Sequence, residues 1–236
     1  MSDPSPPGRR LLRAVSITLG VSLLAAGIAA LAYDLTRAPT PAESKRATER
    51  ELHDRWRRLD AGVLFPAEVN YGADGSDARV ARRVGIAEPA TCRDALDPKA
   101  ADLLAPFGCE TVLRATYVDA SGTEVVTVGV APLRDLDAAR QLVLELSAAG
   151  GSGLRAVSFP GTVAASFTDA RRQASAVSVA GRHLLFQTGG WLDDRPALDG
   201  TAVITRFDHG AAVRDGINDL LVWSADDVCK AEGFKC

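Results

Sequence analysis

The chain has 236 residues and a net charge of −3 at pH 7, so neither its length nor its charge is extreme. After residue 33 it carries 24 basic and 29 acidic residues, without a basic stripe that has interleaved aromatic residues. This balance predicts no nucleic-acid partner, because nucleic acids select a basic surface. Arginine outnumbers lysine 23 to 4, a bias that indicates a bacterium with a high-GC genome.

Residues 14–33 form a run of twenty residues without a charge, directly behind Arg9, Arg10 and Arg13. At about 1.5 Å per residue, a helix of this length reaches roughly 30 Å, the thickness of the hydrocarbon layer of a bilayer. We therefore predict one transmembrane helix at residues 14–33, behind a basic tail at residues 1–13. The membrane is therefore a predicted partner of the chain, through these residues.

A cleaved signal peptide is the alternative, and it would give a secreted protein. Ala30 and Ala32 would suit a signal peptidase, but the apolar core of a signal peptide needs only about 7 to 15 residues. A twin-arginine signal at Arg9 and Arg10 is interrupted by Arg13. The length of the run favours a retained anchor.

The flanks of the run predict its orientation. Three arginines precede it, whereas the other side begins with Asp34 and carries only Arg37 before Glu43. Basic residues near a span stay in the cytoplasm. We therefore expect a cytoplasmic N-terminus and an extracytoplasmic C-terminal domain.

Cysteine usage agrees with an exported domain. The four cysteines are Cys92, Cys109, Cys229 and Cys236, and an even number in an exported domain is typical of disulfides. Of three possible pairings, the two local ones, 92 with 109 and 229 with 236, are favoured. A metal site is not predicted, because the sequence has no CxxC spacing and its three histidines are scattered. No cofactor is predicted either.

Residues 34–61 predict a polar helical stalk. Leu52, Trp56 and Leu59 form a short apolar stripe at helical spacing. The stalk either pairs with a copy of itself or lays Trp56 against the folded domain, and the second arrangement is favoured. The extracytoplasmic domain is expected to cover residues 62–236.

Two hairpin-plus-helix units predict an α+β fold. The first has strands at 112–118 and 125–130, then a helix capped by Asp135. The second has strands at 174–180 and 182–188, turned at Gly181, then a helix at 208–223. A short helix at 98–104 and a strand at 154–159 complete the prediction. We expect an antiparallel sheet covered on one side by helices.

The sequence contains no GxSxG, HExxH, P-loop or GxGxxG signature, so no catalytic residue is predicted. Ser166, Asp169 and His183 contain the residue types of a triad, but the sequence provides no geometry for one. Trp191 follows Gly189 and Gly190, where backbone freedom and an aromatic ring can make a contact surface. The alternative is that Trp191 closes the core at the end of the sheet.

These observations favour a non-enzymatic binding or interaction module, anchored in the membrane and facing a protein or envelope partner. One alternative is an extracytoplasmic hydrolase of envelope material. Another is an accessory subunit of a membrane complex, in which Ser22, Ala26 and Ala30 form a small-residue face that packs against a second helix.

Overall fold

The computed structural model describes residues 7–72, 78–148, 153–193, 195–196 and 207–222. The described chain divides into two compact units, one that ends at Ala47 and one that begins at Thr48. Each is described by itself. The predicted pair of Cys229 and Cys236 lies outside the described residues.

The first unit contains a long apolar helix, α1 (Pro7–Thr36), which includes the whole of the expected span at 14–33. Its segment Leu19–Thr36 has a mean hydropathy of 1.6 and is long and apolar enough to cross a membrane. The polar helix α2 (Pro41–Arg58) begins after four intervening residues. Thr40 and Glu43 exchange hydrogen bonds between backbone and side chain, 2.8 and 3.3 Å long, and so cap this helix.

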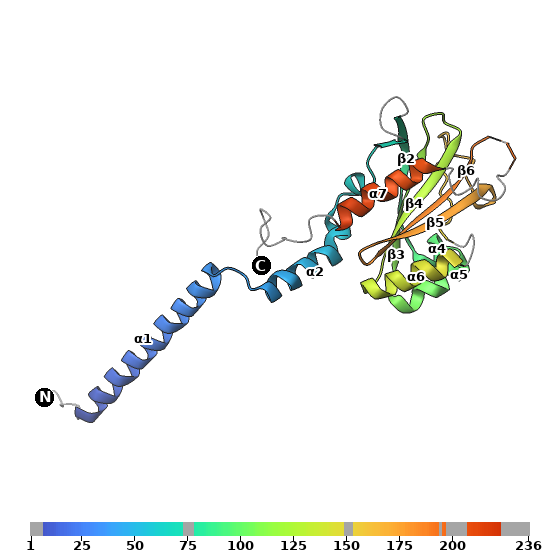
Figure 1. Ribbon diagram of the computed structural model, residues 1–236. Helices are drawn as coiled ribbons and strands as arrows, with labels where there is room; N and C mark the ends of the chain where they lie inside the picture. The colour runs from blue at the N-terminus through green and yellow to red at the C-terminus, as the bar shows by residue number, and fades with distance from the viewer. Residues whose placement is uncertain (1–6, 73–77, 149–152, 194, 197–206, 223–236) are drawn as a thin grey trace. The chain divides into compact units, whose positions relative to one another are not determined.

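The second unit is built on a curled, six-stranded sheet in the order β1-β2-β3-β4-β6-β5, with every neighbouring pair antiparallel (Figure 1). The strands are β1 (Glu68–Tyr71), β2 (Arg79–Thr91), β3 (Thr111–Val118), β4 (Glu124–Pro132), β5 (Arg172–Ala180) and β6 (His183–Trp191). The predicted α+β class with an antiparallel sheet is confirmed.

Both predicted hairpins are present as β3–β4 and β5–β6. Gly122 and Gly181 turn them with φ angles of +72° and +57°, a backbone region that glycine enters without a steric penalty. The predicted strand at 154–159 is wrong. Among the described residues this segment joins no strand of the sheet and makes one isolated bridge, between Leu96 and Leu154.

The sequence analysis missed β1 and β2. Strand β2 is irregular, with register shifts between Arg83 and Gly85 and between Ala87 and Ala90. The second shift contains Pro89, which has no N–H to give to the ladder. The first contains Gly85, where a Cβ atom would lie 2.4 Å from the ring of Phe159. Bulges, charges and a proline hide the alternating pattern of a regular strand.

One face of the sheet, which we call the disulfide face, is covered by α4 (Cys92–Ala95), α5 (Pro98–Leu104) and α6 (Leu136–Ala148). The short helix η1 (Ala105–Phe107) follows α5. Cys92 and Cys109 form the predicted disulfide, with their Cα atoms 6.0 Å apart. Asp135 caps α6 as expected, because its Oδ1 accepts a 2.7 Å hydrogen bond from the N–H of Ala138.

The opposite face, which we call the α7 face, is covered by α3 (Ala61–Leu64) and α7 (Asp208–Val222). Trp56 near the end of α2 and Leu59 just after it pack against the same core, as predicted for Trp56. Helices therefore cover both faces, and the expectation of a one-sided cover is wrong. The reason lies in β4 and β6, which are buried at nearly every residue and so present apolar side chains to both faces.

Candidate functional site

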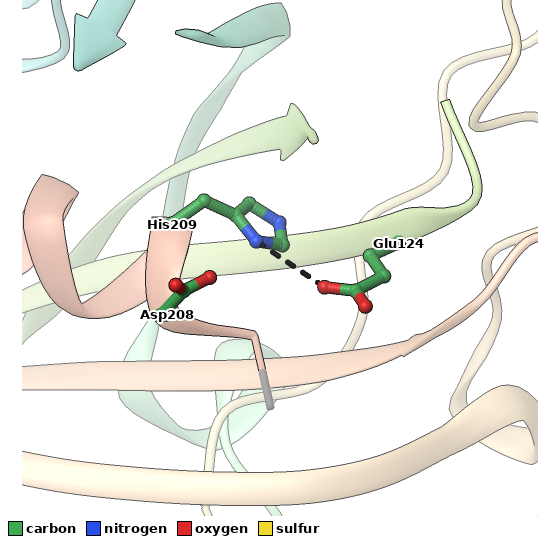
Figure 2. Close-up of side chains that lie close together, drawn as sticks. All are labelled: Glu124, Asp208 and His209. Carbon is green, nitrogen blue, oxygen red and sulfur yellow. Dashed lines mark ion pairs between the residues drawn. The ribbon is translucent and has the colours of Figure 1, made fainter. Parts of the chain in front are cut away.

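Three side chains that can bind a cation meet on the α7 face. Glu124 is the first residue of β4, and Asp208 and His209 begin α7. Figure 2 shows the carboxylates and the imidazole converging on one small region. Their ligand atoms lie within 4.8 Å of one another, and the His209 Nδ1 to Glu124 Oε2 distance is 3.8 Å. The position of the cluster therefore depends on what holds the start of α7.

Strand β6 holds the start of α7 through close packing. The side-chain amide of Gln187 donates a 3.0 Å hydrogen bond to the carbonyl of Phe207, which has a φ angle of +62°. Gly189 makes room for the ring of Phe207, since a Cβ atom there would lie 2.8 Å from Cγ of the ring. Gly210 likewise lies against the side chain of Gln187. These fits fix the next residues, Asp208 and His209, over the sheet.

Tyr71 and Arg79, which face each other across β1 and β2, form one wall of the cluster. The ring of Tyr71 is 5.6 Å from that of His209, and the guanidinium of Arg79 stacks 4.4 Å from the centre of the tyrosine ring. Arg79 also donates a 2.9 Å hydrogen bond to Asp208 Oδ2. Asp208 thus already has one cationic neighbour, with both side chains about half exposed.

The turn before β4 holds Glu124. Asp119 accepts hydrogen bonds from the backbone N–H groups of Ser121, Thr123 and Glu124, at 2.9, 2.9 and 2.7 Å. Burial raises the pKa of Asp119, but these bonds and the Ser121 hydroxyl favour its ionised form and bring the pKa below the ordinary value. The hydroxyl of Tyr71 accepts a hydrogen bond from the N–H of Ala120 on the same turn.

The imidazole of His209 is fully buried, with 0% of its side chain exposed. Neither ring nitrogen has a hydrogen-bond partner among the described residues. Burial lowers the pKa of His209 to about 4, so the ring is neutral at pH 7 and forms no ion pair with Glu124 at that pH. One ring nitrogen therefore keeps a free lone pair, which is the form of histidine that binds metal ions.

The predicted contact surface lies beneath this cluster. Trp191 is 2% exposed and its ring packs 5.4 Å from that of Phe207. Gly189 lies against Phe207, and a Cβ atom on Gly190 would lie 2.1 Å from the carbonyl oxygen of Arg171. This burial favours the alternative interpretation, in which Trp191 closes the core. Gly189 and Trp191 support the start of α7, whereas Gly190 lies against Arg171 instead.

The three residues considered as a triad do not meet. Asp169 lies in the short helix η2 (Asp169–Arg171) before β5, where its carboxylate accepts a 2.8 Å hydrogen bond from the N–H of Ala156. His183 lies at the other end of the hairpin, opposite Ala180. Eight residues of strand at about 3.3 Å each separate the two ends by roughly 26 Å. Ser166 is exposed on the loop before η2.

Two small hollows lie elsewhere in the described part of the domain. One, of about 180 Å³, is bordered by His53 and Trp56 of α2 and by Glu110. The other, of about 230 Å³, lies between Ser147 of α6 and Ser175 of β5. Both are smaller than the roughly 300 to 1,000 Å³ of typical small-molecule sites.

Comparison of the chain with models of protein families, with curated proteins and with solved structures finds no match. Function is therefore inferred from the geometry alone. The cluster was not predicted from the sequence, because Glu124 is far along the chain from Asp208 and His209 and no motif spacing joins them.

Proposed function

We propose that this chain is a single-pass, membrane-anchored protein of the cell envelope. In this proposal its folded domain lies outside the cytoplasm and binds a protein or envelope partner without catalysing a reaction. The observation that carries it is the combination of an apolar N-terminal helix with a disulfide in the folded domain. A disulfide persists in oxidising compartments, and the helix supplies the attachment.

The binding role is supported by what the domain offers to a ligand. The sequence has no GxSxG, HExxH, P-loop or GxGxxG signature, and the two hollows described above are smaller than typical small-molecule sites. The hydrolase is therefore the weaker alternative. A partner that binds over a broad surface needs no deep cleft.

Membrane extraction tests the anchor. We expect the full-length protein to stay in the membrane pellet after alkaline carbonate washing and to be released by detergent. A mature protein that begins after Ala32 would instead establish cleavage and secretion. Release of the uncleaved protein by carbonate would refute the anchor.

Protease and thiol labelling test the orientation. We expect protease added to intact spheroplasts to digest the domain, and Cys92 and Cys109 to react with a maleimide only after reduction. Protection from protease, together with thiols that react without reductant, would place the domain in the cytoplasm.

Replacing Ser22, Ala26 and Ala30 by leucine tests the complex-subunit alternative. If the domain alone recruits the partner, complexes captured by crosslinking are unchanged, because the substitutions keep the helix apolar. Loss of the captured complex would instead make the helix the binding element.

A further inference from the structure

We propose that Glu124, Asp208 and His209 form a binding site for a divalent transition-metal ion of the Zn²⁺ type. The donor set consists of one imidazole nitrogen and two carboxylate oxygens, drawn from the first residues of β4 and α7. This inference concerns a site on the folded domain and does not depend on the membrane anchor.

The first argument is the unpartnered imidazole. His209 is fully buried, and both of its nitrogens lack a hydrogen-bond partner among the described residues. Leaving such a polar group buried without a partner is costly unless a ligand satisfies it. Its Nδ1 points towards Glu124 (Figure 2). The buried ring therefore brings an unpaired nitrogen to the two carboxylates.

The second argument is the spacing of the donors. The 3.8 Å between His209 Nδ1 and Glu124 Oε2 is too long for a hydrogen bond. Two ligands bound tetrahedrally to one Zn²⁺ ion, each about 2.0 to 2.2 Å from it, lie about 3.4 Å apart. A small movement of the Glu124 side chain therefore brings both atoms to ligand distance.

The donor types select the class of cation. Imidazole suits Zn²⁺ and its neighbours, whereas Ca²⁺ and Mg²⁺ prefer oxygen ligands alone. Three protein ligands leave the fourth tetrahedral position to water or to a donor from a partner. The ion can reach the buried ring from the carboxylate side, because the side chains of Glu124 and Asp208 are 14% and 44% exposed.

Arg79 is the competitor for this site, because its guanidinium neutralises Asp208 through a 2.9 Å contact. The competition provides a test that separates the two interpretations of the cluster. If the cluster is only an ion pair beside a buried histidine, replacing Arg79 has no effect on metal affinity. If the cluster binds a metal ion, replacing Arg79 by methionine raises the affinity, because it removes a repelling charge.

The experiment is a titration of the full-length, oxidised protein in detergent micelles with Zn²⁺, followed by calorimetry. We expect one saturable site that binds Zn²⁺ more tightly than Ca²⁺ or Mg²⁺. Glu124→Gln and Asp208→Asn should each weaken Zn²⁺ binding at least about tenfold. These side chains are partly exposed, so both variants are expected to fold, which circular dichroism verifies. His209→Phe extends the series if it folds.

Asp54→Asn is the matched control. Asp54 is 47% exposed and also pairs with an arginine, Arg57, but it lies on α2 and not on β4 or α7. Zn²⁺ binding should be unchanged in this variant and tighter in Arg79→Met. The proposal is overturned if neither the natural protein nor Arg79→Met binds Zn²⁺, if Arg79→Met binds no more tightly, or if Glu124→Gln and Asp208→Asn bind as well as the natural protein.

Discussion

The disulfide face and the α7 face of the sheet bury similar apolar cores but treat their polar groups differently. On the disulfide face, the buried hydroxyls of Thr116 and Thr127 are 2.9 Å apart, and both also bond to the backbone of Val157. Asp97 there binds Arg172 through two hydrogen bonds, 2.8 and 2.9 Å long.

On the α7 face, buried histidines are left incompletely paired. His183 uses Nδ1 towards the carbonyl of Ala180 at 3.0 Å, but its Nε2 has no partner among the described residues. His209 has none for either nitrogen. The disulfide face also leaves the Nε atoms of Arg114 and Arg172 without a hydrogen-bond partner among the described residues, whereas the unpaired atoms of the α7 face include those of imidazoles. Because a neutral imidazole can bind a metal ion and a guanidinium cannot, we expect the α7 face to serve binding and the disulfide face to serve stability.

Removal of the disulfide tests this division with the largest expected effect on stability. Replacing Cys92 and Cys109 together by serine frees a loop closed over a sequence separation of 17 residues. We expect a loss of about 3 kcal/mol in the free energy of unfolding on the chain-entropy model. Urea unfolding in micelles, followed by tryptophan fluorescence, measures it. The division predicts that Zn²⁺ affinity stays the same in the folded variant, and a parallel loss of affinity would contradict it.

The buried His183 makes stability depend on pH. Burial lowers its pKa from about 6.5 to about 4, so between these values the unfolded chain binds a proton that the folded protein does not. Stability is therefore complete above pH 6.5 and falls on acidification towards pH 4, by at most about 3 kcal/mol from this residue.

Unfolding measured at pH 7 and at pH 4.5 checks this effect. His183→Asn keeps a donor for the carbonyl of Ala180 but does not titrate in this range, so the difference between the two pH values should shrink. His209, with its similarly lowered pKa, keeps its own share in both proteins. An equal pH dependence in the two proteins would show that folding does not lower the pKa of His183.

Regular, local signals made much of the fold predictable. The hairpin turns at Gly122 and Gly181, the cap at Asp135 and the nearby cysteines Cys92 and Cys109 each act over a short stretch of chain, and all are present. Strand β2 escaped prediction because bulges break its pattern. Helices on both faces of the sheet were also not predicted. The sequence of β4 does carry a signal for them, because its nearly continuous apolar run is the pattern of a strand buried on both faces.

The cluster could not be predicted, because it depends on tertiary packing. Glu124 meets His209 only when β4 pairs with β6 and β6 positions α7 through Gln187 and Gly189. The sequence marked Gly189 and Trp191 as unusual, and these residues do lie next to the cluster. Both residues are buried beneath the cluster and pack against Phe207, a contact that composition and spacing do not reveal.

Two glycines in matched positions, one on each face, allow a direct comparison of the two faces. Gly189 lies against Phe207 on the α7 face, and Gly129 lies against Leu154 on the disulfide face, each 2.8 Å from the neighbour if a Cβ atom is added. Alanine at either position should cost about 1 to 3 kcal/mol, with Gly129→Ala at the lower end because the flexible end of a leucine can move. Thermal unfolding measures both costs.

The two alanine variants should differ in binding as well. Gly189→Ala displaces Phe207, which precedes Asp208 and His209, so we expect Zn²⁺ affinity to fall. Gly129→Ala should leave it unchanged. Equal affinities in the two variants would show that the packing of Phe207 does not position the cluster.

The smallest expected effects come from two aspartates near helix starts. The carboxylate of Asp135 accepts the hydrogen bond that caps α6, so Asp135→Ala should cost about 1 kcal/mol of stability and leave Zn²⁺ affinity unchanged. Asp208→Asn removes only a half-exposed pair with Arg79, so it should cost about 0.5 kcal/mol while Zn²⁺ affinity falls at least about tenfold. Urea unfolding and calorimetry on both variants give the four values. If Asp208→Asn destabilises the protein more than Asp135→Ala does, then Asp208 is a structural residue, and the α7 face is built for stability in the same way as the disulfide face.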